Sequence, residues 1–76
     1  NISILSYKSL ILELAQKRKR KITFKTIINK KDDAKIDFSS NLYLDDNFIS
    51  KSSGFSKKKA EENVSKKSFD ELKLIM

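Results

Sequence analysis

The sequence contains no cysteine and no histidine. Their absence excludes disulfide bonds, thiolate and imidazole metal ligands, cysteine nucleophiles and histidine general bases, and with them most enzyme classes. No apolar run approaches the roughly 20 residues that a transmembrane helix requires. The chain opens at Asn1, and we expect no signal peptide in these residues. We therefore expect part of a longer intracellular protein, cytoplasmic or nuclear, with no cofactor, no metal and no membrane contact.

The chain is long enough for one small domain. Its 76 residues, of which 38% are hydrophobic, allow a single core that buries roughly 60% of the surface exposed by the unfolded chain. We see no linker and no internal repeat, so residues 1–76 are expected to form one domain.

Positive charge is the most conspicuous property of the composition. Seventeen lysine and arginine residues against ten acidic residues give a net charge of +7. Such an excess attracts polyanions through long-range steering and counterion release, which makes nucleic acid the leading partner class. The charge gathers between Glu13 and Asp32, where no acid occurs, and again at residues 57–59. Surface lysines also solubilise small domains, so charge alone does not establish a binding site.

The first apolar stripe predicts a helix over residues 7–18, because apolar side chains recur there at intervals of three and four residues. The stripe consists of Tyr7, Leu10, Ile11 and Leu14, with Ala15 and Arg18 alongside. Ser6 precedes it and is the expected N-cap, with Ser3 as the competing candidate.

The apolar period then changes to two, which is typical of strands. Alternation predicts strands over residues 22–28 and 36–44, joined by a polar turn at residues 29–34. The acidic turn at residues 45–47 contains residue types that tolerate left-handed backbone, and it predicts a short antiparallel third strand over residues 48–51.

A second helix is predicted over residues 57–74. The single glycine, Gly54, closes the third strand, and Ser56 is the expected N-cap. Apolar and small side chains at four-residue spacing mark the buried face, namely Ala60, Val64, Ser68 and Leu72, with Phe69 adjacent.

This order of elements predicts an α+β fold of the α-β-β-β-α type. Three antiparallel strands would form one sheet, and two helices would pack on one of its faces. The covered face should contain Ile22, Phe24, Ile36, Phe38 and Leu42, and the other face should remain in contact with solvent.

Three lysines at residues 57–59 stand in the first turn of the second predicted helix. Cations are disfavoured there by a few tenths to about 1 kcal/mol each, because the helix dipole is positive at that end. The arrangement is favourable if an anion binds, since backbone N–H groups, the Ser56 hydroxyl and three ammonium groups converge. The alternative interpretation is a solvated lysine run.

Two stretches of the sequence resemble motifs of the double-stranded RNA-binding domain family. Residues 10–17, Leu-Ile-Leu-Glu-Leu-Ala-Gln-Lys, are similar to its Leu-Gln-Glu-Leu-x-Gln-Lys, and residues 54–61, Gly-Phe-Ser-Lys-Lys-Lys-Ala-Glu, to its Gly-x-Ser-Lys-Lys-x-Ala-Lys. Phe24 stands where the family usually has tyrosine, and Phe38 matches its second-strand phenylalanine.

The resemblance implies recognition of A-form RNA by shape, with little sequence preference. The first helix would enter one minor groove, the loop between the first two strands the next, and the start of the second helix would bind phosphates between them, over about 16 base pairs. Glu13, helped by Ser9, would bind 2′-hydroxyls or base edges, and Lys57 and Lys58 would bind phosphates. The full set of expected RNA-binding residues is Ser9, Glu13, Lys30, Lys31, Lys35, Ser56, Lys57, Lys58 and Lys59.

Some positions depart from the family pattern. Residues 31–34, Lys-Asp-Asp-Ala, replace its Gly-Pro-x-His loop, Glu61 replaces a lysine and Leu12 a glutamine. These changes weaken the expected loop contact and the expected affinity. They favour the alternative function, a degenerate member of the fold that mediates protein–protein contact or homodimerisation, whereas the lysines at residues 57–59 argue against it.

Two further motifs, one basic and one acidic, allow several interpretations. The basic run at residues 17–21 is compatible with non-specific phosphate contacts, a nuclear import signal or a solvated turn. The acidic pairs at residues 32–33 and 45–46 are compatible with Mg²⁺ ligands or catalytic carboxylates, although turn chemistry accounts for them better.

The leading hypothesis is a non-catalytic module that binds double-stranded RNA. Ribonuclease III-like and Dicer-like proteins, which act in RNA processing and RNA interference, commonly carry such a domain. We therefore expect any catalytic carboxylates and metal ions of the parent protein to lie outside these residues.

Overall fold

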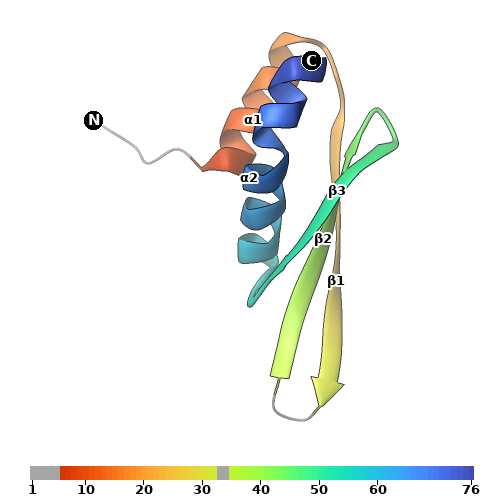
Figure 1. The fold of residues 1–76 in the computed structure, drawn as a ribbon, viewed down its shortest axis with the longest axis vertical. Coiled ribbons are helices and arrows are strands. Elements are labelled where there is room, and N and C mark those ends of the chain that lie inside the picture. The colour runs from red at the N-terminus through yellow and green to blue at the C-terminus, as the bar shows by residue number, and fades with distance from the viewer. Residues whose placement is uncertain (1–5, 33–34) are drawn as a thin grey trace, which may run out of the picture.

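The computed structural model describes residues 6–32 and 35–76, and it contains two helices and three strands in the predicted order. The elements are α1 (Tyr7–Lys17), β1 (Ile22–Asp32), β2 (Lys35–Leu44), β3 (Asn47–Gly54) and α2 (Lys57–Ile75). The strands form one antiparallel sheet in the order β1-β2-β3, and both helices lie on the same side of it (Figure 1). The predicted α+β fold is confirmed.

Side-chain and backbone hydrogen bonds fix both ends of α1. Ser6 is the N-cap, as predicted in preference to Ser3, and its hydroxyl accepts a hydrogen bond of 3.0 Å from the Ser9 N–H. At the other end Lys19 adopts a left-handed conformation with φ 57°, and the Arg20 N–H binds the Ala15 carbonyl at 2.8 Å. A lysine thus takes the place that glycine usually has after a helix, which is why the sequence contains no clear stop signal.

The strands are longer than the alternation predicted. β1 continues to Asp32, so the predicted turn over residues 29–34 was wrong for residues 29–32, and residues 33–34 lie outside the described part of the chain. β3 reaches Gly54 instead of ending at Lys51. Pairs such as Asn29 with Asp37 extend the β1–β2 hairpin past the start of α2 (Figure 1). No helix covers that part of the hairpin, so neither of its faces needs apolar residues and polar side chains are tolerated.

The exposed hairpin also corrects one predicted core residue. Ile36 is 53% exposed, because it pairs with Lys30 in the part of the hairpin that no helix covers. Leu42, by contrast, is fully buried, and Ile22 and Phe24 pack against the core.

The hydrophobic core lies between the sheet and the two helices. Its fully or nearly fully buried members are Ile11 of α1, Leu42 and Leu44 of β2, and Val64 and Leu72 of α2. Tyr7 and Phe69 add an edge-to-face contact between the helices, with 5.4 Å between ring centroids. The buried face of α2 is therefore the predicted one.

Small residues allow α2 to approach the sheet closely. Ser68 is buried, contacts Ser50 of β3 and donates a hydrogen bond of 2.8 Å to the Val64 carbonyl, so its hydroxyl is satisfied without water. At the start of the helix, a Cβ on Gly54 would lie 2.7 Å from the Ala60 backbone nitrogen. Gly54 is therefore required for space and not for an unusual φ.

The β2–β3 connection is a two-residue turn at Asp45 and Asp46. Both residues have positive φ, 51° and 72°, and Leu44 pairs with Asn47 across the turn. This is the geometry of the hairpin turns that favour aspartate, asparagine and glycine. The turn interpretation of this acidic pair is confirmed. The other pair is not tested, because Asp33 and the side chain of Asp32 lie outside the described part of the chain.

Within the described ranges, no helix is both long enough and apolar enough to cross a membrane.

Candidate nucleic-acid interface

The start of α2 presents three exposed lysines. Lys57, Lys58 and Lys59 occupy its first turn, and that turn contains no acidic residue. Ser56 is the N-cap, as predicted, with φ −147° and a side chain that accepts a hydrogen bond of 3.1 Å from the Lys59 N–H. The Ser56 hydroxyl therefore stabilises the helix start from which the three ammonium groups extend.

A groove lies between α1 and the start of α2, and we call it the α1–α2 groove. Its volume is about 860 Å³ and it is open to solvent. The fold brings five of the predicted RNA-binding residues to its walls: Ser9, Ser56, Lys57, Lys58 and Lys59. The Ser9 hydroxyl lies 3.0 Å from the Ser6 hydroxyl, at the edge where α1 begins.

Glu13 is exposed but lies outside the α1–α2 groove. It borders a second depression of about 210 Å³, together with Lys17 of α1 and with Phe69 and Lys73 of α2. Glu13 is one helical turn beyond Ser9, so the two residues share one side of α1 although they border different depressions. A ligand that contacts both must lie along α1.

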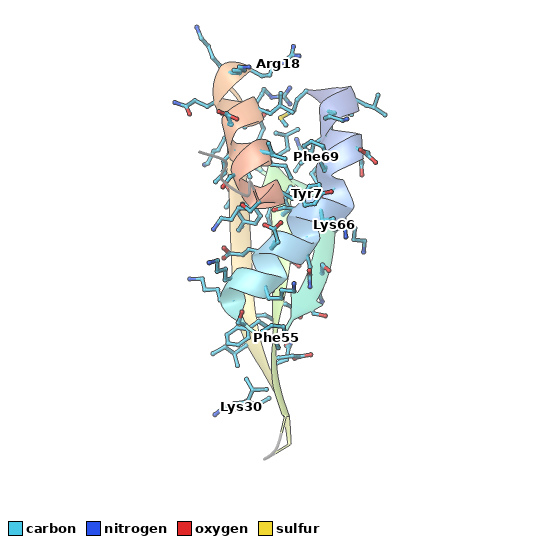
Figure 2. The ribbon with its side chains drawn as sticks, turned by 90° about the vertical axis from the view of Figure 1, so that its left-hand side faces the viewer. Tyr7, Arg18, Lys30, Phe55, Lys66 and Phe69 are labelled. Carbon is cyan, nitrogen blue, oxygen red and sulfur yellow. The ribbon has the colours of Figure 1, made fainter. Side chains whose placement is uncertain are left out.

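The third predicted contact region is the β1–β2 hairpin. Lys30 is exposed near its far end, and Figure 2 shows α1, the start of α2, Phe55 and Lys30 following one another along the molecule. The longest dimension of the protein is 43 Å. Lys31 and Lys35 belong to the paired strands, but their side chains lie outside the described part of the structure.

Glu61 lines the same groove as the three lysines, but it is paired with side chains of α1 and β1. It is only 7% exposed and accepts hydrogen bonds from Lys8 Nζ at 2.6 Å and from Thr26 Oγ1 at 2.9 Å. Burial raises the pKa of Glu61, but the hydrogen bonds from Lys8 and Thr26 outweigh this effect and hold the pKa below its usual value. The glutamate that departs from the family pattern at this position is therefore neutralised by Lys8 of α1.

The neighbouring Glu62 holds the start of α1. Its two carboxylate oxygens accept hydrogen bonds from the backbone N–H groups of Tyr7, at 2.8 Å, and Lys8, at 3.2 Å. Together with Ser6, it satisfies donors that a helix start leaves unpaired. This contact fixes one wall of the α1–α2 groove relative to the other, and nothing in the local sequence around Tyr7 or Glu62 indicates it.

Part of the basic run at residues 17–21 has a structural role. Arg20 Nε contacts Asp45 Oδ2 at 2.5 Å, and the Lys21 N–H donates to Asp45 Oδ1 at 3.0 Å. The hydrogen bonds from the Lys21 backbone and the Arg20 side chain lower the pKa of Asp45. These contacts join the α1–β1 turn to the β2–β3 turn, a structural role that none of the three interpretations of the run included. Lys17, Arg18 and Lys19 remain exposed, and their role stays a prediction.

The residues that the structure describes include no group of three or more acidic side chains placed to hold a metal ion.

The sequence of this chain is similar to that of known proteins. Residues 7–72 match the family described as the double-stranded RNA binding motif. The chain is also 36% identical, over 66 residues, to the protein named Ribonuclease 3 from Zunongwangia profunda (strain DSM 18752 / CCTCC AB 206139 / SM-A87). That alignment covers 87% of this chain but only 27% of the relative, so the chain spans about a quarter of the relative's length.

Proposed function

The chain belongs to the double-stranded RNA-binding motif family, and we propose that residues 1–76 form a single module that binds A-form RNA by shape and charge. The observation that carries the proposal is the exposed lysine turn at residues 57–59, which shares a groove with α1. The deep major groove of A-form RNA is inaccessible to side chains, so a protein recognises its phosphates and 2′-hydroxyls. Lysines on a rigid helix start are suited to binding the phosphates.

We propose the following division of contacts. Lys57 and Lys58 bind phosphates, with Lys59 as a third charge and the Ser56 hydroxyl at the same helix start. Ser9 and Glu13 of α1 contact 2′-hydroxyls or base edges in one minor groove. The hairpin lysines Lys30, Lys31 and Lys35 reach a second minor groove. Figure 2 supports this division, because α1, the start of α2 and Lys30 follow one another along the molecule.

We propose further that the module serves a ribonuclease III-like protein involved in RNA processing. The support is the alignment with a protein named Ribonuclease 3, of which the matching part is 27%. In this proposal the module positions RNA, and the catalytic groups belong to another part of the parent protein. The parent would act inside the cell, in the cytoplasm or the nucleus. A Dicer-like protein of RNA interference is the related alternative for the parent.

A protein partner or homodimer is the second candidate. The observation in its favour is the open face of the sheet, where Ile27 and Phe48 are each more than half exposed. Sedimentation over a range of concentrations tests self-association. A concentration-independent monomer mass would remove the homodimer and leave only a heterologous partner.

The experiment that tests RNA binding is a titration of a 20-base-pair RNA duplex, with DNA duplex and single-stranded RNA of the same sequence as competitors, at two salt concentrations. We expect selective binding to the RNA duplex that weakens as salt rises, because phosphate contacts release counterions. Equal affinity for all three nucleic acids would contradict recognition by shape. No binding at low salt would contradict the proposed function altogether.

A further inference from the structure

The α1–α2 groove contains two exposed apolar side chains in addition to its lysines. Phe55 is 76% exposed and Leu12 is 40% exposed, and both line the groove together with Lys57, Lys58 and Lys59. Single apolar residues on a protein surface need no explanation. These two share the groove with Lys8, with the three lysines of residues 57–59 and with two glutamates. Glu61 is paired with Lys8 and Glu62 binds backbone N–H groups of α1, so the surface is apolar in one part and net positive in another.

The ring of Phe55 makes little contribution to the fold. Three-quarters of the residue is in contact with solvent, and the aromatic pairs among the described residues, both edge-to-face, are Tyr7 with Phe69 and Tyr43 with Phe48. The core therefore does not account for a phenylalanine at this position.

The backbone that carries Phe55 is nevertheless well defined. On one side, Gly54 pairs with Phe38 in the sheet and fits closely against the first turn of α2. On the other side, Ser56 caps α2. The ring is thus attached to a short connection held at both ends, between the start of α2 and the hairpin that carries Lys30 (Figure 2). Such attachment limits the entropy lost when a ligand binds.

A fully paired duplex does not match this mixed surface. Its bases are stacked inside, so it offers phosphates to the lysines but only polar ribose and phosphate groups to Phe55 and Leu12. An unpaired nucleotide offers a flat base to Phe55 and Leu12 and a charged phosphate to the lysines. Unstacked RNA bases are commonly bound on aromatic side chains in this way.

We propose that the α1–α2 groove accepts one unpaired nucleotide of an otherwise double-stranded RNA, with its base on Phe55 and Leu12 and its phosphate at the lysine turn. This inference rests on the proposed RNA-binding function and adds a preference within it. The module binds a duplex that contains a bulged nucleotide more tightly than a perfect duplex.

The test compares two 20-base-pair RNA duplexes of the same sequence, one of which carries a single unpaired adenosine at its centre. We expect the wild-type protein to bind the bulged duplex at least about fivefold more tightly, which is the lower end of what stacking one base contributes. Phe55→Ala should abolish this preference and leave the affinity for the perfect duplex within about twofold. Phe55→Tyr should retain the preference, because it keeps the aromatic face.

Two control variants separate stacking from other effects. Phe48→Ala removes another exposed phenylalanine, 57% exposed in β3, and should leave the preference unchanged. Phe55→Leu keeps an apolar side chain without a ring and should lose the preference. Circular dichroism verifies that each variant is folded.

The outcomes distinguish this inference from the proposed function. Equal binding of both duplexes by the wild-type protein overturns the inference but leaves the proposed function intact. An equal loss of affinity for both duplexes in Phe55→Ala overturns it as well, as does a retained preference in Phe55→Leu. If neither duplex binds, the proposed function and the inference are both wrong.

Discussion

Two basic clusters lie in different parts of this small protein, and their surroundings differ. Lys57, Lys58 and Lys59 extend from the first turn of α2, which contains no acid, and they line an open groove. In the other cluster, Arg20 contacts Asp45 and the Lys21 backbone binds the same carboxylate. The Arg20 side chain and the Lys21 backbone therefore hold two turns together, whereas the lysines of α2 extend their ammonium groups along an open groove. A count of positive charges does not reveal this difference.

Equal losses of charge at the two clusters should have unequal effects on RNA affinity. Lys57→Ala with Lys58→Ala should weaken binding to duplex RNA at least about tenfold and reduce the slope of log Kd against log salt by roughly one to two units, because two phosphate contacts disappear. Isothermal titration at several salt concentrations measures both quantities.

The matched control is Arg20→Gln with Lys21→Gln, which removes the same net charge from the other cluster. It should change the RNA affinity much less than the α2 double variant but lower the melting temperature. Similar losses of affinity in the two double variants would mean that net charge, and not the lysine turn, determines binding.

Glu61 is an acid close to the lysine turn, and its carboxylate is already paired with Lys8 and Thr26. Glu61→Ala should lower the free energy of unfolding by about 1–3 kcal/mol, since Lys8 and Thr26 lose their common acceptor in a largely buried site. Urea unfolding measures the change. Glu71→Ala, an exposed glutamate of the same helix, is the control and should have little effect. An equal effect of both variants would contradict the structural role of Glu61.

The same carboxylate predicts how stability depends on pH. Its pKa is lower in the folded protein than the ordinary value of 4.5, so the folded state favours the ionised form. The resulting stabilisation is present above about pH 4.5 and is lost as the pH falls through the lower folded pKa. Unfolding curves should therefore show a decrease in stability on acidification that is smaller in Glu61→Gln. An identical pH dependence in that variant would contradict the assignment.

The smallest effect is expected at the β2–β3 turn. Asp45→Asn retains a residue type that tolerates positive φ but removes the charge that Arg20 and the Lys21 N–H bind, so the melting temperature should fall. The RNA affinity should change by less than about twofold, because screening limits the effect of one distant charge. Asp46→Asn is the matched control. Among the described residues, the only ion pair of Asp46 is a long one, 3.9 Å, with Lys21. The Asp46→Asn variant should therefore change the melting temperature less than Asp45→Asn.

Local patterns in the sequence account for most of the fold. The helical stripe at Ile11 and the four-residue spacing of Val64 and Leu72 identified the buried faces correctly, because periodicity depends directly on the geometry of a helix. The N-caps Ser6 and Ser56 were also found, since a cap acts within its own helix turn. The lysine turn next to Ser56 was predicted for the same reason.

Strand length was predicted less well for a physical reason. Alternation of polar and apolar residues appears only where one face of a strand is covered, and the outer part of the β1–β2 hairpin is not covered by either helix. Ile36 was therefore assigned to the core although it is more than half exposed. The polar residues around Asn29 were likewise assigned to a turn although they continue β1.

The sequence by itself determined the order of the elements, the N-caps of both helices and the positive charge of the α2 start, because each depends on neighbours within a few positions. Only the tertiary structure decided which charges remain available. Glu61 meets Lys8 across 53 positions, and Arg20 meets Asp45 across 25. Such pairs form only when packing of the core brings distant segments together. The same packing places Phe55 and Leu12, 43 positions apart, in one groove with the lysines.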